Sequence, residues 1–229
     1  MIGIIGALSA EVEGLKSMLT ERRNRNICGI TFSRGKLYGT DVVIAQSGIG
    51  KVMASACAAV MISHFKPALM INTGVAGAVN PELLIGDILV SEGAVQHDFD
   101  LSPIDGTPRG WNPELETVVV KADERAADVL FKAASEEGLR AKKGIIASGD
   151  CFIADNAKKE ELASLFGASA CEMEGAAIAA VSAVNHVPFV ILRAISDGAD
   201  NGAQMDFPAF CQMAADNSIR VMKRAISKL

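Results

Sequence analysis

The sequence predicts an α/β fold, because two kinds of segment alternate along its 229 residues. Short runs rich in Val, Ile and Leu, such as "IGIIG" and "VPFVILRAIS", have the length and composition of buried strands. Longer Ala-rich segments separate these runs, and their length favours helices. No repeat, low-complexity stretch or linker divides the chain. We therefore expect a single domain over residues 1–229, large enough to bury a core without disulfides or metal.

The elements can be assigned in order along the chain. The expected strands are 2–6, a hairpin over 29–48 that turns near 39–41, 68–74, 86–93, 144–150 and 187–196. The expected helices are 9–19, 50–65, 123–137, 156–166, an apolar helix that starts near 175, and 206–229. The basic stretch "ERRNRN" at 21–26 and the Pro-, Gly- and Asp-rich stretch 97–115 are expected to be loops. Loops as long as the second are often functional or lie at an interface.

Composition excludes several classes of partner. The formal net charge is −5 and no long run of Lys or Arg occurs, so we expect no nucleic-acid binding. The five cysteines form no CxxC pair, which is typical of reduced thiols in a cytoplasmic protein. The start "MIGIIGALSAE" lacks the basic region of a signal peptide. The apolar stretch 175–195 is interrupted by Asn185, His186 and Pro188, so it predicts a buried helix and strand and no membrane span.

Glycines and polar side chains follow almost every predicted strand, at 6–11, 47–50, 73–77, 148–150 and 193–197. In open α/β sheets ligands bind at the carboxyl ends of the strands. Two further carboxylates, Glu172 and Glu174, stand in the apolar stretch "CEMEGAAIAA", at the expected start of a helix. Burying a carboxylate without a partner costs several kcal/mol, so these groups indicate a binding site.

Each feature also has a structural interpretation. Strand-end glycines are commonly turn residues, Glu11 could simply favour its helix N-terminus, and Arg193 with Asp197 could be a structural ion pair. "GIGK" at 48–51 is no phosphate loop, because Ala45 and Val52 stand where Gly and Ser or Thr are needed.

Metal and dinucleotide sites are also weakly supported by the sequence. His97, Asp98 and Asp100 could bind a metal, but no second cluster accompanies them, and no metal or other cofactor is expected. No G-x-G-x-x-G follows the first strand, which argues against a dinucleotide-binding oxidoreductase.

The motifs together resemble those of a known family. "IGIIGALSAEVE", "SGIGKV", "INTGVAGA", "GDILVS", "SGDCFI", "CEMEGAAIA" and "VPFVILRAISDGAD" have the order and spacing found in bacterial 5′-methylthioadenosine/S-adenosylhomocysteine nucleosidases of the purine nucleoside phosphorylase-like superfamily. The resemblance implies a three-layer α/β/α fold around a mixed, partly barrel-like sheet, working as a homodimer. It implies hydrolysis of the N-glycosidic bond of these adenine nucleosides, in methionine salvage and the recycling of S-adenosylmethionine by-products, with 5′-deoxyadenosine as a further candidate substrate.

The resemblance also implies roles for single residues. Glu11 would be the general base that activates water, and Asp197 the general acid that protonates adenine N7. Ser196 would orient that acid, and Arg193 would help to hold the water and Glu11. The expected substrate contacts are Glu174 to the ribose hydroxyls, Met173 against the sugar, Gly77 near it, Phe152 stacked on adenine, Ile153 reading its amino edge, and Leu8, Ile49 and Phe207 around the 5′-substituent.

These roles agree with the chemistry of glycoside cleavage, which passes through an oxocarbenium-like state and needs an acid at the leaving group and an activated water opposite. Asp197 must therefore hold a proton near neutral pH. Glu172 has no role that we can derive beyond support of the helix start. One departure is Val75, which stands where many relatives have Ser next to the water or phosphate. Two alternatives remain: a phosphorylase of the same superfamily, which Glu11's charge disfavours, and a non-catalytic nucleoside sensor.

Overall fold

The computed structural model describes residues 1–197 and 207–229, with side chains for 1–197 and 212–229. Its strands form a single mixed sheet, part of which closes into a barrel. Five strands close the ring in the spatial order β5, β10, β6, β8, β9 and back to β5. Their bounds are β5 Leu69–Ala78, β6 Ile88–Gln96, β8 Ala141–Ser148, β9 Ala168–Glu172 and β10 Phe189–Asp197. Parallel β5 and β10 are central to the site, because both end at the same edge of the sheet.

The other strands extend the sheet beyond the barrel. From β5 the order continues through β1 (Ile2–Gly6), β4 (Thr40–Gln46), β3 (Ile30–Leu37) and β2 (Thr20–Ile27), while the short β7 (Val120–Lys121) pairs with β6. β1 is parallel to both β4 and β5, so the polar residues after β1 meet those after β5. The expected hairpin is confirmed, and it turns at Tyr38 and Gly39.

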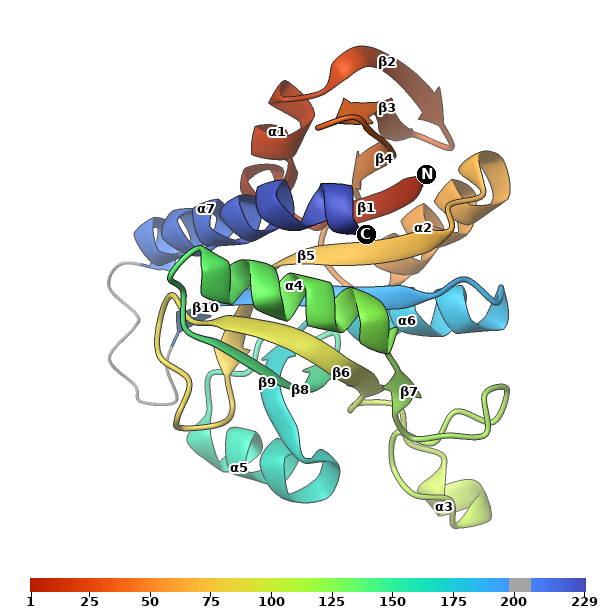
Figure 1. Ribbon diagram of the computed structural model, residues 1–229. Coiled ribbons are helices and arrows are strands. Elements are labelled where there is room, and N and C mark those ends of the chain that lie inside the picture. The colour runs from red at the N-terminus through yellow and green to blue at the C-terminus, as the bar shows by residue number, and fades with distance from the viewer. Residues whose placement is uncertain (198–206) are drawn as a thin grey trace.

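Helices cover both faces of the sheet (Figure 1). On one face lie α1 (Ser9–Ser17), α4 (Glu124–Glu136) and α7 (Phe207–Ala225), whose apolar residues share one core cluster with β1 and β4. On the other face lie α2 (Lys51–Phe65) and α6 (Gly175–Val184), which belong to a second cluster. This confirms the three-layer α/β/α arrangement around a mixed sheet, and the chain ends in a short 3-10 turn, η2 (Ile226–Lys228).

A third, smaller core lies under α5 (Asn156–Phe166), where Leu162 and Phe166 pack against Ala168 and Val95. Helix α5 begins as the sequence predicts, because the side chain of Asp155 accepts hydrogen bonds from Ala157 N and Lys158 N at the first turn. The region 97–115 is mostly loop, as expected, but contains the short helix α3 (Ser102–Asp105).

Two expectations were wrong. "ERRNRN" is not a loop but part of β2, an exposed strand at the edge of the sheet. Its polar side chains hide the alternation that marks a half-buried strand, and charged residues are typical of edge strands. The strand β9 was also missed, and Glu172 is its last residue and not part of a helix. β9 consists of only four small residues and Glu172, too close to α6 for a separate strand signal, and pairing with β5 and β8 makes this segment a strand.

Candidate active site

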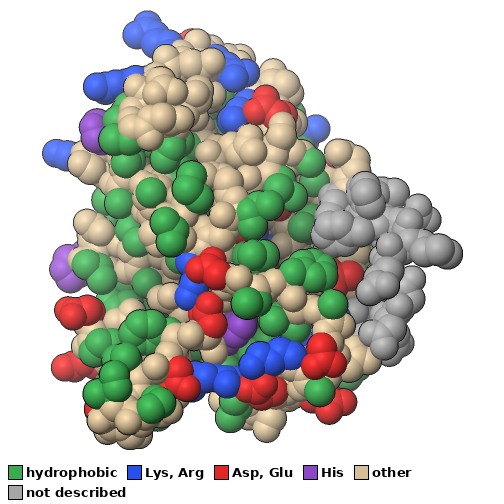
Figure 2. All heavy atoms as spheres, turned by 180° about the vertical axis from the view of Figure 1, so that it is seen from behind, with side chains coloured by type: hydrophobic (Ala, Val, Ile, Leu, Met, Phe, Trp, Pro, Cys, Tyr) green, Lys and Arg blue, Asp and Glu red, His purple; other side chains and the backbone are tan. Residues whose placement is uncertain are grey.

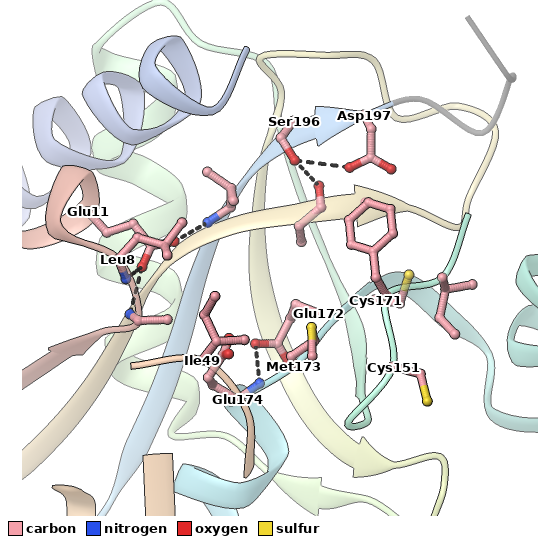
Figure 3. A pocket seen from close by; sticks show the side chains of 16 residues that line it. Leu8, Glu11, Ile49, Cys151, Cys171, Glu172, Met173, Glu174, Ser196 and Asp197 are labelled. Carbon is pink, nitrogen blue, oxygen red and sulfur yellow. Dashed lines mark hydrogen bonds between the residues drawn. The ribbon is translucent and has the colours of Figure 1, made fainter. Parts of the chain in front are cut away.

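One cavity opens at the carboxyl ends of β1, β5 and β10, the edge of the sheet that the sequence indicates. It is lined by Ala7, Leu8, Glu11, Ile49, Val75, Ala76, Gly77, Cys151, Phe152, Ile153, Cys171, Glu172, Met173, Glu174, Ser196 and Asp197. Figure 3 shows Glu11 and Asp197 on opposite sides of this cavity, with Met173 and Glu174 between them. The lining is mostly apolar, so the few carboxylates decide its chemistry.

Glu11 is a buried carboxylate held by backbone amides. Its Oε2 accepts hydrogen bonds from Ala7 N at 2.7 Å and Leu8 N at 2.8 Å, and its Oε1 accepts one from Val75 N at 3.1 Å. Burial raises the pKa of Glu11 above its ordinary value, although the charge of Arg193 and these amides oppose the rise. A carboxylate of raised basicity that faces a cavity is suited to accept a proton.

Arg193 lies behind the pocket and not on its surface. Its Nη2 donates to Glu172 Oε2 and to Asn72 Oδ1, and the Arg193–Glu172 ion pair is almost completely buried. A Cβ at Gly74 would overlap both Arg193 Nη1 and Glu11 Oε1, so glycine lets these two groups face each other closely. Arg193 thus supplies positive charge to Glu11 through a fixed position in the core.

Glu172 anchors the junction between β9 and α6. It accepts hydrogen bonds from the backbone N–H groups of Glu174 at 3.1 Å and Gly175 at 2.9 and 2.8 Å, and from the hydroxyl of Ser148. Together with Arg193, these donors satisfy the charge of the buried carboxylate. The sequence pattern located Glu172 but could not identify Arg193 as its partner.

Glu174 is the N-cap residue of α6 and reaches into the cavity. Its Oε1 accepts a hydrogen bond from Gly50 N at 2.7 Å, and among the described residues this carboxylate accepts no other hydrogen bond. Burial and the nearby charge of Glu172 raise the pKa of Glu174 to about 7. The carboxylate retains acceptor capacity for hydroxyl donors from a ligand.

Asp197, the last residue of β10, faces the opposite side of the cavity. Its Oδ1 accepts a hydrogen bond from Ser196 Oγ at 3.0 Å, and its Oδ2 lies 3.6 Å from Lys159 Nζ. A Cβ at Gly77 would lie 2.8 Å from Oδ2, so glycine makes room for this carboxyl group. Lys159 is buried, yet the sequence offers no signal for it, because "NAKKEELASLF" has the composition of an ordinary exposed helix.

The predicted site residues, with two exceptions, line this cavity. Arg193 lies just outside it, and the side chain of Phe207 lies outside the described residues. Phe152 and Ile153 come from the loop after β8, and Phe152 is 62% exposed. Sequence reasoning missed Cys151 and Cys171 as lining residues and Lys159 as a neighbour of Asp197.

The described residues hold no group of three His, Cys, Asp or Glu side chains that could bind a metal ion. Asp98 instead accepts a hydrogen bond from the Lys51 ammonium. Within the same residues, no helix is both long and apolar enough to cross a membrane.

The chain is similar to known proteins over its full length. The profile of the Phosphorylase superfamily matches residues 1–227. The 5′-methylthioadenosine/S-adenosylhomocysteine nucleosidase of Staphylococcus aureus (strain MRSA252) is 38% identical over 230 residues, covering 100% of both chains.

Solved structures agree with this relationship. The Neisseria meningitidis 5′-methylthioadenosine/S-adenosylhomocysteine nucleosidase in complex with methylthio-immucillin-A has a TM-score of 0.94 and 33% identity, covering 100% of this chain and 99% of that one. A mutant of the Helicobacter pylori (strain 26695) futalosine hydrolase has a TM-score of 0.93 and 36% identity, with coverage of 100% and 99%. Sequence and fold therefore agree that the chain belongs to the phosphorylase superfamily and, within it, to the 5′-methylthioadenosine/S-adenosylhomocysteine nucleosidases.

Proposed function

We propose that this protein hydrolyses the N-glycosidic bond of 5′-methylthioadenosine and S-adenosylhomocysteine, releasing adenine and the 5′-thio-ribose. The observation that carries the proposal is a mostly apolar cavity with buried Glu11 and Asp197 on opposite sides and Glu174 between them (Figure 3). Glycoside cleavage needs an acid at the leaving group and a base for water on the opposite face of the sugar. The relatives' established activity supports this assignment.

Asp197 is the general acid in this mechanism and gives its proton to adenine N7. The Ser196 hydroxyl, 3.0 Å from Asp197 Oδ1, orients the carboxyl group. When the proton leaves, Asp197 becomes a carboxylate, and the Lys159 ammonium 3.6 Å from its Oδ2 stabilises that charge. Lys159 therefore promotes the transfer of the proton to the base.

Glu11 is the general base that takes a proton from water beneath the sugar. Its three amide donors hold the carboxylate in one orientation, and Arg193 limits the rise of its pKa. As the C1′–N bond breaks, positive charge develops on the sugar, and the negative charges of Glu11 and Glu174 stabilise it.

The remaining lining residues bind the substrate. Glu174 accepts hydrogen bonds from the ribose hydroxyls, and Met173 and Gly77 contact the sugar. Phe152 stacks on adenine, the backbone of Ile153 reads its amino edge, and Leu8 and Ile49 surround the 5′-substituent. Phe207 completes that pocket in our proposal, on the basis of the sequence resemblance alone. A futalosine-type nucleoside is a second candidate substrate, because a similar structure is a futalosine hydrolase.

Water is the nucleophile and not phosphate. A phosphate ion at this position would meet the negative charge of Glu11 and the methyl groups of Val75, which offers no hydroxyl donor. The Val75 amide already donates to Glu11, so the backbone has no spare donor at this residue.

We also place the protein in the cytoplasm as a homodimer. The support for a dimer is the apolar surface at the start of α2, where Ile49 is 59% and Val52 is 76% exposed. Figure 2 shows hydrophobic side chains gathered on the face seen from behind. Large exposed apolar patches indicate interaction surfaces. Sedimentation analysis of the purified protein tests this assignment, with a monomer as the contrary result.

The function is tested by adenine release from a panel of 5′-modified adenosines and futalosine, with and without phosphate. We expect the 5′-thioethers to release adenine without phosphate. The variant Glu11→Gln should lose turnover but still bind nucleoside, because the amide keeps the shape but cannot take a proton. A loss of binding as large as the loss of rate would contradict a purely catalytic role for Glu11. Release that requires phosphate would identify a phosphorylase, and no turnover of any substrate would indicate a sensor.

A further inference from the structure

Three segments around the cavity are joined by a closed ring of hydrogen bonds. Lys51 N donates to Asp150 Oδ1 at 2.7 Å, and Asp150 N donates to Asp98 Oδ2 at 2.9 Å. The Lys51 ammonium closes the ring by donating to Asp98 Oδ1 at 2.6 Å. None of the three residues lines the cavity, and none has a part in the mechanism above. The ring joins the start of α2, the loop after β6 and the loop after β8.

Two glycines allow these segments to approach so closely. Gly50 has a φ of 93°, a conformation that side chains rarely adopt, and a Cβ there would lie 3.0 Å from Asp150 Oδ1. A Cβ at Gly149 would overlap His97 Nε2 and lie 3.1 Å from Asp98 Cγ. The backbone at both positions is therefore shaped to fit the ring.

The Lys51–Asp98 contact is stronger than an ordinary surface ion pair. The two side chains are only 16% and 28% exposed, and the ammonium also lies 3.3 Å from Gln96 Oε1. Burial raises the pKa of Asp98, but the hydrogen bonds and charge supplied by Lys51 and Asp150 outweigh it and hold this pKa below its ordinary value. Asp98 is thus a carboxylate at neutral pH, and its contacts are charge-assisted hydrogen bonds.

The ring is linked to the adenine side and to the sugar side of the cavity through different backbone amides. Asp150 begins the segment 150–153, whose Phe152 and Ile153 line the cavity, and its own amide is held by Asp98. On the sugar side the contact to Glu174 comes from a different amide, that of Gly50. Loss of the Asp98 carboxylate would therefore remove the hydrogen bond to the Asp150 amide, on the adenine side, and leave the Gly50–Glu174 hydrogen bond in place.

We propose that Asp98 and Lys51 are positioning residues for the purine base. They hold the segment 150–153 at the distance from the sugar site at which Phe152 and Ile153 can contact adenine. This inference rests on the proposed function, in which adenine lies between Asp197 and the pair Phe152 and Ile153. It also gives a role to Asp98, for which the sequence suggested only metal binding.

The test compares binding of the two products, adenine and 5-methylthioribose, to Asp98→Asn and Lys51→Met by calorimetry. We expect the Kd of adenine to rise roughly tenfold in both variants, the size of one charge-assisted hydrogen bond. The Kd of 5-methylthioribose should not change. In turnover of 5′-methylthioadenosine, KM should rise while kcat changes little. Lys51→Arg, which keeps the cation, should retain most of the affinity for adenine, and the double variant should be no weaker than the single ones.

Glu136→Gln is the matched control, because it removes a carboxylate that pairs with Lys228 at 2.9 Å, at the end of α4 and outside the lining of the cavity. It should leave both affinities unchanged, and thermal unfolding of every variant shows whether it is folded. Equal losses of adenine and sugar affinity would overturn the proposal in favour of a general structural role, and so would unchanged adenine affinity. Failure of the proposed function has a separate signature, because the wild-type protein would then release no adenine.

Discussion

Glu11, Glu174 and Asp197 each have a different environment in the cavity, and this gives each carboxyl group a different chemistry. Glu11 is held by three backbone amides and faces Arg193, Glu174 has one amide donor, and Asp197 has a hydroxyl and an ammonium beside it. The amide donors depend on how the backbone runs, so they tolerate sequence change around them. The Asp197 contacts depend on the side chains of Ser196 and Lys159, which substitutions can remove.

Asp197→Asn should reduce the release of adenine by several orders of magnitude, because an amide cannot deliver a proton to N7. A nitrophenyl riboside, whose leaving group departs without protonation, should lose much less. Steady-state rates on both substrates check this. Equal losses would show that Asp197 has a structural role.

Val75→Ser should make hydrolysis faster by several-fold at most. The hydroxyl would add one hydrogen bond to the nucleophilic water, worth about 0.5–1.5 kcal/mol. Useful phosphorolysis should not appear, because Glu11 still repels phosphate. Product analysis in phosphate buffer decides the point: dominance of a sugar 1-phosphate would disprove the water-selecting role of Glu11.

At the scale of elements, the junction of β9 and α6 carries Met173 and Glu174, the residues that we propose contact the sugar. β9 ends at Glu172, Met173 and Glu174 follow, and α6 begins at Gly175. Glu172 satisfies amides at the start of α6 and pairs with Arg193 on β10, so one side chain joins two strands and a helix. The position of Glu174 therefore depends on a carboxylate that makes no proposed contact with substrate.

Glu172→Gln should lower the free energy of unfolding by about 3–5 kcal/mol, because it removes the hydrogen-bonded carboxylate that pairs with the buried Arg193. Urea unfolding measures this change. Glu136→Gln removes a carboxylate from an exposed ion pair and should have no measurable effect. A small effect of Glu172→Gln would contradict this and would mean that Glu11 is enough to balance the charge of Arg193.

At the scale of the whole molecule, one sheet joins the barrel to the edge strands, and two core clusters cover its faces. We propose that the chain folds as one domain, because both clusters draw residues from early and late segments of the sequence. The cavity lies where three parallel strands end, so the site forms only when β1, β5 and β10 are paired. Its buried carboxylates then make stability depend on pH.

Glu174 should make the folded protein less stable as the pH rises from 4.5 to 7. Its pKa is about 7 in the folded protein against 4.5 for an unperturbed glutamate, so folding favours the protonated form. The stability it contributes is fully present below pH 4.5 and is lost as the pH passes through 7. Urea unfolding of wild type and Glu174→Gln at several pH values tests this. The difference between them should change over this range and become constant above it, whereas parallel curves would contradict the raised pKa.

The elements with a strong apolar pattern were predictable from sequence. The buried strands 2–6 and 187–196 and the Ala-rich helices lie close to their expected bounds, because burial imposes composition directly. β2 and β9 were not predictable, since the first is polar and exposed and the second is short. Both are strands because neighbouring strands supply their hydrogen bonds.

The sequence by itself determined the α/β class, the edge of the sheet where the site lies and, through its motifs, the family and most of the lining residues. Only the tertiary structure decided the partners: Arg193 with Glu172, Lys159 with Asp197, and Lys51 with Asp98 and Asp150. The reason is physical. Burial and backbone conformation restrict which residue types can occupy a position, so both can be predicted from a single sequence. A pairing between distant charges depends on how strands and loops are brought together in space, and many pairings suit the same composition.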